Sequence, residues 1–201
     1  MEPDIGATKQ KALVTGSPDR VLPVAVALQA RNWEVVTVDA PDMLPAVCAS
    51  LGQSAIDLYI QLPVNVASTG DSVVARLQAF LAGGLLTRFD DAAVVLGTLR
   101  PDASVVLVAG NLPAELTAPD DRQARISLMK VLLQAIRADT APAPVRTVVV
   151  DHMRTPDEIV EIAVDSTATR LSEIAGMAAR YPEMDYVDWR LAVLSLASIE
   201  S

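Results

Sequence analysis

The sequence is poor in residues that build several common kinds of functional site. Its 201 residues include one cysteine, Cys48, and one histidine, His152. An intrachain disulfide is therefore impossible, and zinc sites built on several histidines are excluded. A lone cysteine favours a reducing compartment, and no run of about 20 apolar residues could span a bilayer. We therefore expect a cytoplasmic protein that is not associated with a membrane.

Basic residues are also scarce. The chain has 16 basic and 25 acidic residues, a formal net charge of −9, and only three lysines, Lys9, Lys11 and Lys130. The arginines are scattered along the sequence rather than clustered. An excess of negative charge repels a phosphate backbone unless a local basic patch overrides it. The sequence therefore predicts no binding to nucleic acid.

Aromatic residues make up only 3% of the chain, although 51% of its residues are hydrophobic. The core must therefore consist of Val, Leu, Ile and Ala, which is typical of a parallel sheet covered by helices. Five short apolar runs alternate with segments of helical periodicity, and this alternation predicts repeated β-α-β crossovers and a three-layer, doubly wound α/β fold. The predicted strands lie at 11–16, 34–38, 56–62, 104–109 and 146–150.

Helical periodicity and capping residues predict the intervening elements. Residues 71–99 are helical in pattern but interrupted at Gly83 and Gly84. The sequence Thr155-Pro-Asp-Glu158 is typical of a helix start, with a Thr cap and Glu at the third position. The other expected helices cover 21–31, 42–51, a segment from Thr117 to 138, 155–180 and 185–197. We divide the chain into a flexible tail (1–10), one domain (11–180) and a C-terminal helix (181–201) that packs on the domain or on a partner.

Four fragments carry a recognisable pattern through their order. They are the first strand with Thr15 and Gly16, Asp39 after the second strand, Ile56-Asp57-Leu58, and the helix with Thr87 and Arg88 that leads to 104–110. Together they resemble the short-chain dehydrogenase/reductase family over roughly residues 11–165. The resemblance implies strand order 2-1-3-4-5. It also implies a cofactor site at Thr15, Gly16 and Asp39, to which we add Arg20 as a candidate. Asp39 either holds a ribose hydroxyl or simply ends the strand and caps the helix after Pro41.

The departures from the family pattern concern the cofactor loop first. Arg20 and Leu22 stand where the family has its later glycines, whose lack of side chains lets the backbone approach a diphosphate. We expect these side chains to project into that volume, although Arg20 could meet a phosphate from the side. Only 17 residues separate Asp39 from Asp57, too few for the family's usual helix, strand and second helix. The chain therefore resembles a truncated member.

The residues that perform the family's chemistry are missing as well. The catalytic serine position falls near Gly110, and Gln61-Leu62-Pro63-Val64 replaces the Asn-Asn-Ala-Gly motif. The family needs an ionisable phenol beside a lysine that lowers its pKa. None of the tyrosines, which are Tyr59, Tyr181 and Tyr186, has a lysine four residues later. We therefore predict no catalytic residues of this family.

The remaining candidates have ordinary interpretations beside functional ones. His152 follows the fifth strand, where it could face a ligand or solvent. Cys48 is more typical of a buried small side chain than of a nucleophile. Asp90-Asp91 and Asp120-Asp121 could act as paired carboxylates, but solvation at helix ends explains them. We expect no metal site.

Three functional hypotheses follow from these observations. The first is a non-catalytic, short-chain-dehydrogenase-like protein that acts as a binding, scaffolding or regulatory subunit, in a homodimer or a hetero-complex. The family resemblance implies pairing through 85–99 and 120–138. The second is an oxidoreductase, or another small-molecule enzyme, with an altered site and NAD as its cofactor. The third is a sensor of a nucleotide or acyl ligand. We favour the first, without a bound cofactor.

Overall fold

The structure is a computed structural model that describes residues 9–66, 69–110, 119–140, 145–150 and 153–164. The chain divides into two compact units, residues 1–166 and 167–201, and all that follows concerns the first. The predicted helix at 185–197, the domain boundary at 180 and His152 lie outside the described residues. So does most of the tail at 1–10.

Five parallel strands form one sheet in the order β2-β1-β3-β4-β5, which confirms the predicted fold class and strand order. Neighbouring strands pair in register, so that Leu13 lies beside Val36 on one side and Tyr59 on the other. The strands are β1 (Lys11–Thr15), β2 (Glu34–Val38), β3 (Ile56–Gln61), β4 (Leu99–Val108) and β5 (Arg146–Val150).

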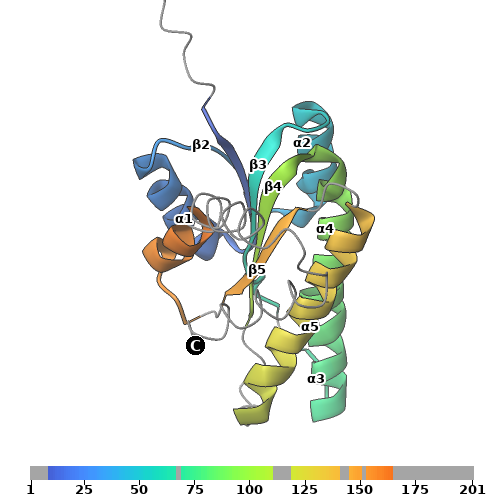
Figure 1. The fold of residues 1–201 in the computed structure, drawn as a ribbon. Coiled ribbons are helices and arrows are strands. Elements are labelled where there is room, and N and C mark those ends of the chain that lie inside the picture. The colour runs from blue at the N-terminus through green and yellow to red at the C-terminus, as the bar shows by residue number, and fades with distance from the viewer. Residues whose placement is uncertain (1–8, 67–68, 111–118, 141–144, 151–152, 165–201) are drawn as a thin grey trace, which may run out of the picture. The chain divides into compact units, whose positions relative to one another are not determined.

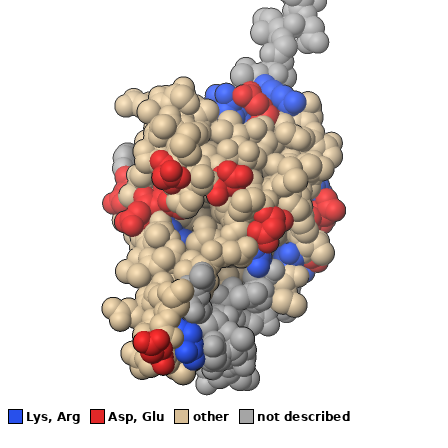
Figure 2. All heavy atoms as spheres, turned by 180° about the vertical axis from the view of Figure 1, so that it is seen from behind, with Lys and Arg blue, Asp and Glu red and all other residues tan. Residues whose placement is uncertain are grey.

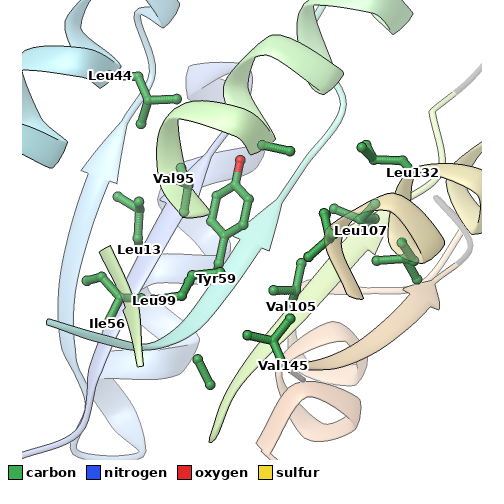
Figure 3. Close-up of a cluster of buried hydrophobic side chains, with 14 of the residues drawn as sticks. Leu13, Leu44, Ile56, Tyr59, Val95, Leu99, Val105, Leu107, Leu132 and Val145 are labelled. Carbon is green, nitrogen blue, oxygen red and sulfur yellow. The ribbon is translucent and has the colours of Figure 1, made fainter. Parts of the chain in front are cut away.

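Helices cover both faces of this sheet (Figure 1). On one face α1 (Pro18–Ala30) and the helix at 156–164 pack on side chains such as Val14 and Ile60. On the other face α2 (Leu44–Leu51), α4 (Thr87–Val95) and α5 (Pro119–Asp139) pack on side chains such as Leu13 and Leu107. Figure 3 shows part of this second cluster around Tyr59. Because both faces are covered, the middle of each central strand is apolar, as in Ala12–Val14 of β1 and Val105–Val108 of β4.

The predicted interruption at Gly83 and Gly84 is a change of helix type. The chain runs from α3 (Val73–Phe80) through a π-helical turn, η2 (Leu81–Leu86), into α4. A Cβ on Gly84 would lie 3.0 Å from Val66 Cγ2, so the glycine gives Val66 room against the turn. Neither α3 nor η2 has a buried residue, and Figure 1 shows α3 at the carboxyl edge of the sheet.

Two short 3₁₀ turns complete the described elements, η1 (Pro41–Met43) and η3 (Leu96–Thr98). The helix start at Thr155 is confirmed, because its amide donates to Glu158 Oε2 at 2.8 Å and Glu158 N donates back to Thr155 Oγ1 at 3.3 Å. Strand β4 begins five residues before the predicted strand. Its first residue, Leu99, pairs with Ile56, and a register shift follows.

Candidate functional site

The connection between β1 and α1 consists of only two residues, Gly16 and Ser17. Gly16 has a φ of +141°, a conformation that side chains rarely adopt. A Cβ at this position would lie 2.7 Å from Leu62 Cβ and 3.0 Å from the Leu62 carbonyl oxygen. Gly16 is therefore required for close contact with the chain that leaves β3, and that chain fills the space beside it.

Hydrogen bonds tie the same connection to the segment after β3. The Leu62 amide donates to the Thr15 carbonyl at 2.8 Å, and the Ser17 amide donates to the Pro63 carbonyl at 3.3 Å. The Ser17 hydroxyl accepts a hydrogen bond from the Asn65 amide instead of capping α1. The protein itself therefore uses the polar groups that a ligand would need in this connection.

The first turn of α1 is equally unsuited to a diphosphate. Pro18 has no N–H to offer, and the Arg20 and Val21 amides both donate to the Ser17 carbonyl, at 2.9 and 3.0 Å. The Asp19 carboxylate accepts a hydrogen bond from Asn65 Nδ2 at 3.1 Å and adds a negative charge where an anion would otherwise be favoured. The helix start is thus already occupied, sterically and electrostatically.

The structure brings the predicted cofactor residues to one edge of the sheet. Thr15 is buried, and the Gly16 amide donates to the Val38 carbonyl at 3.3 Å, which places exposed Asp39 on the neighbouring strand end. Arg20 is half-buried on α1, and its Nε has no hydrogen-bond partner in the described part of the chain. Leu22 points to solvent and is 67% exposed, because α1 begins at Pro18. Leu22 therefore does not fill the diphosphate volume, whereas Leu62 packs against the glycine.

A buried cluster of polar side chains lies at the same edge of the sheet, on the face that α4 covers. It was not predicted. The Thr15 and Tyr59 hydroxyls are 3.0 Å apart. Gln61, the last residue of β3, exchanges hydrogen bonds with Arg88 of α4: Arg88 Nε donates to Gln61 Oε1 at 3.1 Å, and Gln61 Nε2 donates to the Arg88 carbonyl at 3.0 Å. Only 3% of Arg88 and 1% of Tyr59 is exposed. No local pattern predicts this cluster, since a lone arginine is normally a surface residue.

Burial dominates the electrostatics of this cluster. It lowers the pKa of Arg88 to about 10, with Tyr59 and Asp91 acting in the opposite direction. It raises the pKa of Tyr59, only partly offset by the hydrogen bond with Thr15. At neutral pH Arg88 is therefore charged and Tyr59 is neutral. A dehydrogenase of the family that the sequence resembles needs a tyrosine whose pKa is lowered, and the pKa of Tyr59 is shifted in the opposite direction.

The other candidate residues show no assembled chemistry. Cys48 is buried on α2, and burial raises the pKa of its thiol. Burial and Asp90 raise the pKa of Asp91. A Cβ on Gly110 would lie 3.1 Å from Pro63 Cβ. Among the described residues, no three His, Cys, Asp or Glu side chains gather as metal ligands would. The side chains of Asp120 and Asp121 are not among those that the structure describes.

Comparison with known proteins places the fold. No family model matches the sequence, and neither does any curated protein. Solved structures do match. A protein of Burkholderia multivorans provisionally named a short-chain alcohol dehydrogenase superposes with a TM-score of 0.60 at 12% identity, over 79% of this chain and 92% of its own. Protein lin1944 of Listeria innocua has a TM-score of 0.56 at 13% identity, over 78% of this chain and 93% of its own.

A short-chain dehydrogenase family protein of Francisella tularensis gives a TM-score of 0.52 at 14% identity, over 80% of this chain and 92% of its own. The chain shares the fold of short-chain dehydrogenases. The match extends over nearly the whole length of these neighbours. At such low identity it establishes the Rossmann-like architecture, and the function has to be argued from the site.

Proposed function

We propose that this protein is a non-catalytic relative of the short-chain dehydrogenases that acts as a binding, scaffolding or regulatory subunit. The observation that carries the proposal is the occupied start of α1, where Ser17, Asp19 and Asn65 bind one another. A dinucleotide needs free backbone amides and a glycine surface at this point. Pro18 has no N–H, the Asp19 carboxylate adds a negative charge, and Leu62 packs against Gly16.

The missing proton-transfer residues support the same conclusion. No tyrosine in the chain is followed by a lysine four residues later. Tyr59, the tyrosine within the described residues, is sealed in the core with its hydroxyl beside that of Thr15. A hydride transfer coupled to proton transfer has no donor among these groups. In this proposal the chain has kept the sheet and helices of the fold and has lost the chemistry.

Titration calorimetry with NADH and with NADPH tests the proposal on the purified full-length chain. We expect no saturable heat with either dinucleotide. Binding in the low-micromolar range that is lost in Asp39→Ala would instead favour the oxidoreductase or the ligand sensor, because Asp39 is the exposed carboxylate beside the β1 end. Turnover of alcohol or carbonyl substrates would then decide between these two functions.

The partner surface that we propose lies on α4 and α5, which also pair chains in the family that the sequence resembles. Exposed apolar side chains on these helices are Leu86 just before α4, Val94, Leu128 and Val131. Apolar groups with low charge are typical of interface cores. The partner is a second copy of this chain or a different protein in the cytoplasm. Native mass spectrometry of the purified protein reports which of these assemblies forms.

Nucleic acid and membrane are not the partners that we propose. Figure 2 shows acidic side chains dispersed over the face that it draws, with no broad basic surface there. The net charge of −9 opposes binding to phosphate polymers. In the part of the chain that the structure describes, no helix has the length and apolar character needed to cross a bilayer.

A further inference from the structure

Helix α5 carries a second apolar stripe besides the one that packs on the sheet. The side chains that face the sheet are buried and include Met129, Leu132 and Ile136. The residues of the second stripe, which we call the outer stripe, recur every three or four positions and are all exposed; they are Leu128, Val131, Ala135 and Ala138. A helix that packs only on its own domain has one such stripe, with polar residues opposite. The outer stripe is therefore available to a partner.

The charges beside the outer stripe differ from those of the chain as a whole. From 126 to 139, α5 has two basic residues and one acidic residue, Lys130, Arg137 and Asp139, and all three are exposed. The whole chain carries a net charge of −9, so two copies repel each other over most of their surfaces. On the described part of α5 this excess of negative charge is absent, and two copies can meet there without it.

Helix α4 enlarges the apolar surface. It lies beside α5 on the same face of the sheet (Figure 1). Leu86, just before α4, is 57% exposed, and Val94 within it is 37% exposed. A stable interface involves about 20 residues on each side, which is more than the outer stripe alone contains. The two helices together offer a broader surface, with the outer stripe as its apolar part on α5.

The order of large and small side chains makes the outer stripe complementary to itself. Leu128 and Ala138 are equally far from Leu133 along the helix, and so are Val131 and Ala135. When two copies of one helix pack antiparallel about a twofold axis at the level of Leu133, residues equally far from it face each other. Leu128 then faces the partner's Ala138, and Val131 faces the partner's Ala135. A large side chain meets a small one in both layers, which allows close packing.

We propose that a second copy of this chain covers the outer stripe, in an antiparallel and twofold-symmetric helix pair centred on Leu133. This inference rests on the proposed function, because it names the partner for which α4 and α5 provide the surface. It adds the register, which follows from the positions of two large and two small side chains on α5. Both copies use the same surface, so the assembly closes at two chains.

The test introduces opposite charges at two positions that face each other across the twofold axis. In the full-length chain, Leu128→Asp and Ala138→Lys each place an unpaired charge in the interface of two identical variants. When the two variants are mixed, the new carboxylate of one chain faces the new ammonium group of the other. The control mixes Leu128→Asp with Val131→Lys, whose lysine lies about 10 Å along the helix from position 138. Native mass spectrometry distinguishes every pair by its mass, and circular dichroism checks that each variant is folded.

We expect a dimeric wild type and mainly monomeric single variants at the same concentration. The mixture of Leu128→Asp with Ala138→Lys should form a dimer with one chain of each, and its dissociation constant should be at least about tenfold below that of either variant alone. The control mixture should show no such recovery.

Two results would overturn the proposal. Equal recovery in both mixtures would exclude the register. A monomeric wild type would exclude a second copy as the occupant, and this measurement decides even if a variant does not fold. It would leave the non-catalytic function standing, because that function also allows a different protein as the partner, whereas binding of NADH in the calorimetric test would contradict the function and not the dimer.

Discussion

Replacing Gly16 with alanine should destabilise the protein more than the same change at Gly52, which also has a positive φ but has open surroundings. The alanine Cβ would lie 2.7 Å from Leu62 Cβ and 3.0 Å from the Leu62 carbonyl oxygen, and the φ of +141° would be strained. A sparsely populated backbone conformation costs about 1–3 kcal/mol. Overpacking costs about 1–3 kcal/mol more. We therefore expect a loss of about 2–6 kcal/mol, a large part of the roughly 5–15 kcal/mol of a typical domain.

Two other glycines separate these contributions. Gly52 has a φ of +80° but nothing within 4 Å of a Cβ, so Gly52→Ala carries only the backbone strain, about 1–3 kcal/mol. Gly97 has open space and no positive φ, so Gly97→Ala should stay within about 0.5 kcal/mol of wild type. The three variants should therefore fall in the order Gly16, Gly52, Gly97, from most to least destabilised.

Urea unfolding followed by circular dichroism measures this order. The midpoint should move while the slope of the transition stays constant, and with a slope of about 2 kcal/mol/M the Gly16→Ala midpoint should fall by roughly 1–3 M. A Gly16→Ala variant no less stable than Gly52→Ala would refute the reasoning. It would mean that the chain after β3 does not press on Gly16, and the argument for an occupied loop would fail with it.

Three further variants test other parts of the structure. Tyr59→Phe should lower the free energy of unfolding by about 1–3 kcal/mol at neutral pH, because it leaves Thr15 without its partner. The pKa of Tyr59 is raised in the folded state, so wild type should also lose stability relative to this variant as the pH rises above about 10. Urea titrations at each pH measure both effects. Thr155→Ala should cost about 1 kcal/mol by removing a helix cap, and equal midpoints would contradict the cap. Val131→Asp on α5 should reduce the mass of any assembly seen by native mass spectrometry, while Val26→Asp, at an exposed position of α1, should not.

The sequence was sufficient for the elements whose signal is local. The strands at 34–38 and 146–150 have the predicted bounds, because valine-rich runs between turn residues are typical of strands. The cap at Thr155 is also predictable from local sequence, since both of its hydrogen bonds are with Glu158, three residues later. The extra residues of β4 were missed because Pro101 and the charged Arg100 and Asp102 do not resemble a strand.

The candidate site depends on contacts between distant segments, which local patterns do not contain. Asn65 reaches Ser17 and Asp19 across more than 40 residues of sequence, and nothing around it predicts that contact. Arg88 likewise bonds to Gln61 across 27 residues of sequence. The sequence predicts that the side chains of Arg20 and Leu22 obstruct the first loop. The structure instead places Leu22 in solvent and ties the loop to the segment after β3.

The most direct test of the central claim observes the backbone amides at the start of α1 while NADH is added. In ¹H–¹⁵N spectra of the full-length protein, the Ser17 and Asn65 amides should be protected from exchange, because each donates to an oxygen of the protein. With increasing NADH, the amide signals of residues 16–21 should stay in place. A saturable shift of the Asp19 and Arg20 amides, with loss of protection at Ser17, would show that a dinucleotide opens the loop and would contradict the account.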